Sequence, residues 1–267
     1  GLYFDAAGRL LICEGGNRRM TRLEADGSLS VLMDSYQGKR LNSPNDLWVA
    51  PGGDVYFSDP RYGDASGLEQ DGMHVYLIPA DGRAPLRVTD DLKTPNGLIG
   101  TVDGRTLYVA DAGAGSIWRY AVAQDGTLSA KTLFTERASD GMSLDERGNV
   151  YLANGNRIWV HAGDGRLIET IPVPEAPANL TFGGPDRRTL FITARTSLYR
   201  IAMKVRGAWT PVEGGAAPTA QPSETVAAGP SPSPSATALP PPSATRPAPE
   251  ATPTQPRERR FVPSLGR

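Results

Sequence analysis

The chain has 267 residues, with 28 Lys and Arg against 29 Asp and Glu and a formal net charge of −1 at pH 7. This balance provides no basic stripe to neutralise phosphates, which argues against nucleic acid as a main partner. A single cysteine, Cys13, excludes an internal disulfide framework and a cysteine-based zinc cluster. No stretch approaches the roughly 20 apolar residues that span a bilayer, so no membrane partner is expected, and the compartment stays unknown.

One sequence pattern recurs along the chain: an apolar strand, a Gly turn and a second strand rich in aromatic or branched residues. The copies lie at 2–11, 45–57, 96–109, 140–152 and 179–192. Further strand signals lie between the copies, for example at 74–78 and 86–88, and helical periodicity is absent. Asp-Gly pairs at 26–27, 81–82, 125–126 and 164–165 mark hairpins that need a positive φ. Four strands per unit and a period of roughly 40 to 50 residues predict an all-β propeller with about five blades.

The ends of the chain suggest two further expectations. An open set of five blades would leave edges exposed, and the first copy lacks the polar pair that precedes the others. We therefore expect the propeller domain, 1–207, to be incomplete at its N-terminus. Residues 208–267 are rich in Pro, Ala, Ser and Thr and have few large apolar side chains, which predicts a disordered tail.

Three polar residues stand in phase just before the first strands of successive units. They are Asn45, Asn96 and Asp140, and the fourth position in this series is Ala178. Because the innermost strand of a blade lines the central channel, these side chains should converge at one mouth. Their oxygens suit a hard divalent cation. The alternative is that each makes only an Asx turn or caps a loop.

The segments around these residues carry a family resemblance. The motifs lie at 44–47, 95–98 and 139–142, with further matches at 38–46, 57–63 and 178–184. Together they resemble the senescence marker protein/gluconolactonase/luciferin-regenerating enzyme-like family, in its bacterial gluconolactonase branch. This resemblance implies a six-bladed propeller that hydrolyses a sugar lactone or a similar lactone with one divalent cation. Calcium is the first expectation, and Zn²⁺, Mg²⁺ or Mn²⁺ are alternatives.

The resemblance also implies roles for individual residues. Asn96 and Asp140 match metal ligands of the family, and Asp140 matches its general acid/base. Asn45 matches a channel Asn that contacts substrate or metal. The family's Glu ligand belongs to an opening Glu-Gly-Pro motif that this chain lacks, and Glu14 is expected in a turn or in a hydrogen bond between blades instead. Without that ligand and one blade, we expect this chain to be inactive by itself.

Three further residues are candidates for substrate binding. Arg40 could reach in from its loop, although a solvated arginine is the simpler interpretation. Asp59 and Tyr62 are candidates for the pocket rim, with structural turn roles equally open. The two histidines, His74 and His161, fall on outer strands, where a surface or interface imidazole is expected rather than a catalytic one.

Two other function classes stay open. One is a noncatalytic binding module of the NHL type, and the other is an enzyme like the strictosidine synthase propellers. Serine hydrolysis is unsupported because the sequence has no Gly-x-Ser-x-Gly elbow. The expected partner is a small-molecule lactone, bound by a monomer.

Overall fold

The computed structural model describes residues 1–208, which fold entirely from β-strands and connecting turns. The chain divides into two units, 1–221 and 222–267, and the second lies wholly outside the described residues. The tail predicted to be disordered therefore lies outside them too, except for Ala208, whose backbone N–H donates to the carbonyl of Leu144. Among the described residues, no helix is long and apolar enough to cross a membrane.

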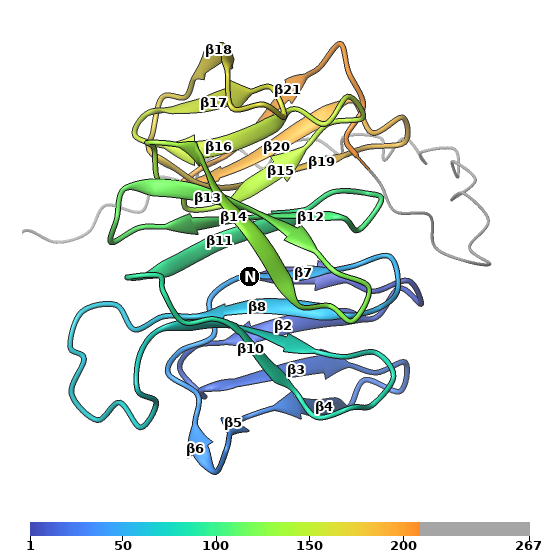
Figure 1. Ribbon diagram of the computed structural model, residues 1–267. Helices are drawn as coiled ribbons and strands as arrows, with labels where there is room; N and C mark the ends of the chain where they lie inside the picture. The colour runs from blue at the N-terminus through green and yellow to red at the C-terminus, as the bar shows by residue number, and fades with distance from the viewer. Residues whose placement is uncertain (209–267) are drawn as a thin grey trace, which may run out of the picture. The chain divides into compact units, whose positions relative to one another are not determined.

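Five antiparallel sheets follow one another in chain order and form blades 1 to 5 (Figure 1). Blade 1 contains β1 (Leu2–Phe4), β2 (Leu10–Glu14), β3 (Arg19–Leu23) and β4 (Leu29–Met33). A small hairpin of β5 (Ser35–Tyr36) and β6 (Lys39–Arg40) precedes blade 2, which contains β7 (Leu47–Val49), β8 (Val55–Asp59), β9 (His74–Ile78) and β10 (Leu86–Thr89).

The next two blades repeat this four-stranded arrangement. Blade 3 contains β11 (Pro95–Gly100), β12 (Thr106–Asp111), β13 (Ser116–Val122) and β14 (Leu128–Thr135). Blade 4 contains β15 (Met142–Leu144), β16 (Val150–Asn154), β17 (Arg157–His161) and β18 (Leu167–Pro172). Blade 5 has three strands within the described residues: β19 (Pro177–Gly183), β20 (Thr189–Ala194) and β21 (Leu198–Ala202).

The hairpins form where the sequence predicts them. Gly27, Gly82, Gly126 and Gly165 have φ values of 83°, 79°, 83° and 94°. A residue with a Cβ is disfavoured at such angles, so each Asp-Gly pair sets the turn between the third and fourth strands of its blade.

Apolar side chains pack between neighbouring blades in four clusters. Each cluster contains buried side chains of two successive blades: Leu11 and Phe57, Trp48 and Leu107, Ile117 and Leu152, and Val160 and Leu190. Blades are thus held face to face, as the strand pattern of a propeller requires. The predicted all-β propeller is confirmed, with five blades in the described part of the chain.

Blades 1 and 5 are not joined in this way. Within residues 1–208, none of the four apolar clusters includes both of these blades. Leu2 and Phe4 on β1 are 65% and 64% exposed, and Leu198 on β21 is 67% exposed. The ring of described blades is therefore open on this side, with apolar side chains on both edges of the opening.

Candidate functional site

The three polar residues singled out in the sequence stand at the start of the inner strands of blades 2, 3 and 4. In blades 2 and 4 the backbone of the second strand helps to fix this position. Asn45 N donates to Ser58 O at 2.9 Å, and Asp140 N donates to Ala153 O at 3.0 Å. Asn45 and Asp140 therefore project from a fixed backbone, and Asn96 lies at the corresponding end of blade 3, where the β11–β12 register shifts.

The side chains of these residues form one connected group. Asn45 Nδ2 donates to Asn96 Oδ1 at 2.7 Å. The Asn96 side chain also forms a hydrogen bond with the Asp140 carboxylate. Residues separated by 51 positions in the chain are thus brought into contact across two blades. The structure places all three oxygen-bearing groups together, as the repeat pattern predicts.

Asp140 supplies the only carboxylate of this triplet. The surrounding protein desolvates the carboxyl group and raises its pKa, although the residue as a whole is exposed on one side. The hydrogen bond from Asn96 acts in the opposite direction and lowers the pKa of Asp140. Desolvation is the larger of these two effects, so the Asp140 carboxyl group holds its proton more tightly than a free aspartate does.

A pocket of about 460 Å³ opens at this end of the blades. Its polar lining side chains are Tyr62, Asn96, Ser139, Asp140 and Asn154. Tyr62 is 48% exposed, and its phenol pKa is raised first by burial and then by the charges of Asp140 and Asp46. The phenol therefore remains a neutral hydrogen-bond donor beside the carboxylate.

Asp59 does not line this pocket. It is fully buried, and its two carboxylate oxygens accept from the backbone N–H groups of Asn42 and Ser43, both at 2.7 Å. Burial raises the pKa of Asp59 to about 6, against these two hydrogen bonds. Asp111 in blade 3 holds Lys93 N and Thr94 N in the same manner. This geometry favours the structural turn role, in which Asp59 fixes the loop that leads to Asn45.

Two other residues also lie apart from the pocket. Arg40, in the β5–β6 hairpin, is exposed, and its backbone N–H donates to Glu69. Glu14 takes the turn role expected for it, because its carboxylate accepts from Arg19 and Thr21. These contacts lower the pKa of Glu14 to about 2.

Of the two positions expected for the histidines, surface or interface, the structure excludes the surface. His74 and His161 lie on β9 and β17, but each is only 4% exposed rather than at the surface. His161 Nδ1 lies 2.8 Å from Gly165 O, and His74 Nε2 lies 3.0 Å from an Asp71 oxygen. Neither imidazole is among the residues that line the pocket at Asp140.

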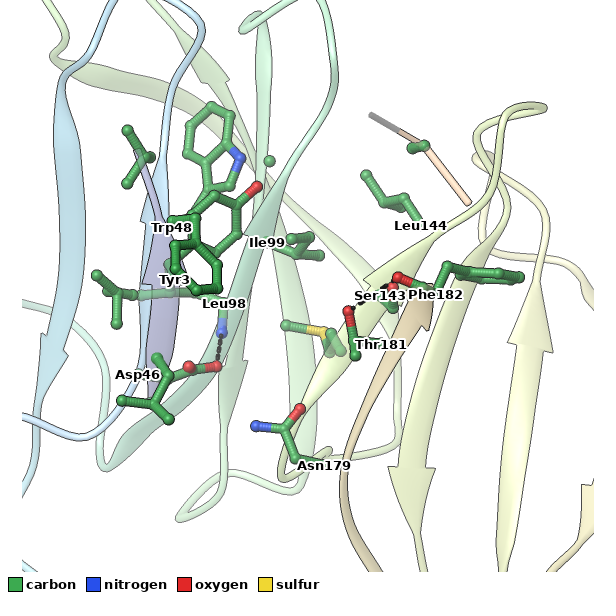
Figure 2. A pocket seen from close by; sticks show the side chains of 18 of the residues that line it. Tyr3, Asp46, Trp48, Leu98, Ile99, Ser143, Leu144, Asn179, Thr181 and Phe182 are labelled. Atoms are coloured by element: carbon green, nitrogen blue, oxygen red, sulfur yellow. Dashed lines mark hydrogen bonds between the residues drawn. The ribbon is translucent and has the colours of Figure 1, made fainter. Parts of the chain in front are cut away.

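A larger pocket of about 760 Å³ lies along the inner strands and does not include Asp140. Figure 2 shows its side chains, from β7 and β11 on one side and from β15 and β19 on the other. The Asp46 carboxylate lies here and accepts from Leu98 N at 3.3 Å, and burial raises its pKa to about 6. The larger pocket therefore contains a carboxylate of its own, but none of Asn45, Asn96 and Asp140 lines it.

Asn154 and Ser139 were not identified as pocket residues from the sequence. Asn154 aligns with Asp59 and Asp111 at the end of a second strand, so the repeat favoured a turn role. In blade 4, however, this position lines the pocket beside Asp140. Ser139 Oγ donates to Gly141 O at 2.8 Å, which fixes the backbone on either side of Asp140.

Fold and site together define a β-propeller with a group of amide and carboxylate oxygens at one mouth. The sequence signature of the family described as SMP-30/Gluconolactonase/LRE-like region matches residues 1–196. The chain belongs to this family, whose propellers have six blades.

Individual relatives agree with this assignment. A gluconolactonase from Zymomonas mobilis is 31% identical over 227 residues, which cover 78% of this chain and 64% of the relative. A 6-deoxy-6-sulfogluconolactonase from Pseudomonas putida is 29% identical over 185 residues, covering 64% of this chain and 61% of the relative. A solved gluconolactonase from Xanthomonas campestris is 37% identical with a TM-score of 0.70, covering 76% of this chain and 71% of that one. The chain thus spans less than two thirds of the length of the Zymomonas mobilis and Pseudomonas putida relatives.

Proposed function

We propose that this chain carries catalytic and cation-binding residues of a lactonase, which hydrolyses a sugar lactone or a similar lactone. The observation that supports it most is the contact chain from Asn45 through Asn96 to Asp140 at a pocket. Membership of the family and the gluconolactonases among its relatives support the same reaction.

The donor set suits one hard divalent cation, with calcium as the first candidate and Zn²⁺, Mg²⁺ or Mn²⁺ as alternatives. Asn96 Oδ1 uses one lone pair for Asn45, which leaves the second available to a cation, and Asp140 contributes the negative charge. Asn45 Oδ1 is a third oxygen of the same group. A bound cation would act as a Lewis acid toward the lactone carbonyl.

Asp140 is the proposed proton-transfer group, because it lines the pocket and carries the only carboxylate of the triplet. Hydrolysis adds water to the carbonyl carbon and breaks the bond to the ring oxygen. The Asp140 carboxylate takes a proton from the attacking water and returns it to the departing ring oxygen. A cation held beside Asp140 would lower the pKa of the attacking water, which would make the first of these transfers possible for a carboxylate.

Tyr62 and Asn45 are the proposed substrate contacts. Tyr62 lines the same pocket as Asp140, and its neutral phenol can donate to a sugar hydroxyl or to the lactone ring oxygen. Asn45 is half-buried next to Asn96, where it fixes the orientation of that amide. Arg40 stays a candidate only for the outer rim, because its hairpin does not line this pocket.

Chelation and cation replacement test this function in protein expressed from the complete gene. A panel including glucono-1,5-lactone should be hydrolysed, the rate should fall on addition of a chelator, and calcium should restore it. Hydrolysis that survives chelation would instead favour the chemistry of the strictosidine synthase-like propellers. No hydrolysis of any lactone, with the cation still bound, would favour a binding module.

A further inference from the structure

Two arginines of blade 4 share one indole ring. The guanidinium carbon of Arg137 lies 3.4 Å from the ring centroid of Trp159, and that of Arg157 lies 5.4 Å from it. Arg137 precedes the inner strand β15, whereas Arg157 begins β17. Stacking on an aromatic face restrains a planar guanidinium and leaves its N–H edges free to donate.

Neither arginine has an acidic partner within residues 1–208. No ion pair joins either guanidinium to a carboxylate, and Nε of Arg137 is buried without a hydrogen-bond acceptor. Several other arginines of the described chain do form ion pairs. Arg19 binds Glu14 at 3.1 Å, and Arg87 binds Asp71 at 2.7 Å. The two guanidinium groups on Trp159 thus carry positive charge that no side chain of the described protein neutralises.

The pair lies beside the pocket that contains Asp140. Arg157 stands opposite Asn154 in the register of β16 and β17. Trp159 Nε1 donates to Asn154 O at 3.2 Å, which holds the indole against the same residue. Asn154 lines the pocket, and so does Ala138, the residue next to Arg137. Neither arginine lines the pocket itself, but each adjoins a residue of its blade 4 side.

We propose that Arg137 and Arg157, held on Trp159, bind an oxyanion group carried by the lactone at a position away from its reacting carbonyl. A fork of guanidinium N–H groups matches the paired oxygens of a phosphate, sulfonate or carboxylate. The identity of the molecule that carries the anion rests on the proposed lactonase function. The anion site itself rests on the geometry of the arginine pair.

Hydrolysis of two lactones that differ only in one anionic group tests whether the arginines bind the substrate. In protein from the complete gene, Arg137→Gln should raise KM about tenfold for gluconolactone phosphorylated on its 6-hydroxyl. KM for the uncharged gluconolactone should stay within about twofold. Arg157→Gln, at an exposed site that tolerates substitution, should act in the same direction. Arg105→Gln is the matched control, because Arg105 lies in the turn between β11 and β12, at the opposite end of blade 3. Equal effects of Arg137→Gln on both lactones would overturn the proposal.

Direct titration keeps the anion site testable even if no lactone is hydrolysed. The chain should bind inorganic phosphate or sulfate with a heat signal and a change in tryptophan emission, and parallel titrations with acetate should rank the oxyanion classes. Arg137→Gln should weaken this binding about tenfold, and Arg137→Lys should retain part of it. Unchanged affinity in Arg137→Gln, or an equal loss in Arg105→Gln, would contradict a specific site. Failure of hydrolysis together with retained anion binding would count against the proposed function alone.

Discussion

A Cβ atom on Gly97 would lie 1.8 Å from the backbone carbonyl oxygen of Asp140. Blades 3 and 4 therefore touch backbone to backbone at the residue proposed to move the proton. Gly141 N also donates to Ala178 O at 2.8 Å, so blade 4 meets blade 5 in a similar way one step further on. Close contact between inner strands is what brings polar groups from separate blades to one mouth.

Gly97→Ala should consequently disturb both stability and the site. The added methyl group cannot be accommodated by a side-chain movement, because the atom that it meets belongs to the backbone. We expect a loss of about 3 kcal/mol or more in the free energy of unfolding, measured by urea denaturation. The position of Asp140 should shift with the backbone, so the lactone hydrolysis rate should fall as well.

Gly52→Ala is the matched control for this substitution. A Cβ on Gly52 would have no atom within 4 Å, and this glycine does not have a positive φ. The control should change stability by less than about 1 kcal/mol. If Gly97→Ala were as stable as the control, the tight contact between blades 3 and 4 would be wrong.

Asn96→Ala should weaken cation binding. Asn96 contacts Asn45 on one side and Asp140 on the other, so its removal takes away one oxygen and the orientation of two more. Calcium titration calorimetry should show about a tenfold or greater loss of affinity. Asn156→Ala, in an exposed turn of blade 4, should leave the affinity unchanged. Equal affinities of the two variants would remove Asn96 from the ligand set.

Asp59 should make a recognisable contribution to the pH dependence of stability. Its pKa is about 6 in the folded chain and about 3.8 in the unfolded chain, so the folded state binds the proton more tightly. Stability from this group is therefore greatest at low pH and is lost as pH rises from about 4 to above 6, by about 2 kcal/mol. Urea unfolding of wild type and Asp59→Asn at pH 4.5 and pH 7 measures this contribution to the free energy of unfolding. The stability of wild type relative to the variant should fall over this interval, and a constant difference would contradict the raised pKa.

The repeat made the architecture predictable from the sequence. Strand, turn and strand recur with Asp-Gly pairs such as 81–82, and each pair forms the predicted turn. The polar triplet was predictable for the same reason, since residues in phase on successive blades must converge on the axis. Asn45, Asn96 and Asp140 follow from alignment of the chain with itself.

Contacts that do not follow the repeat were harder to predict from the sequence. Asp59, Asp111 and Asn154 occupy the same position in their blades, yet two hold loop amides and the third lines the pocket. That difference depends on the length and path of each preceding loop, which the repeat does not specify. The stacking of Arg137 and Arg157 on Trp159 joins a loop to an outer strand, and no periodic pattern relates these residues.

Hydrolysis of glucono-1,5-lactone by Asp140→Asn is the most direct measurement of the central claim. The carboxamide preserves the size of the side chain but cannot accept the proton of the attacking water, so kcat should fall at least about 100-fold while the circular dichroism spectrum is retained. Asp91→Asn should keep its activity, because Asp91 is 56% exposed and pairs with Lys131 on the outside of blade 3. A kcat for Asp140→Asn within a few-fold of wild type would contradict the assignment of Asp140 as the proton-transfer group.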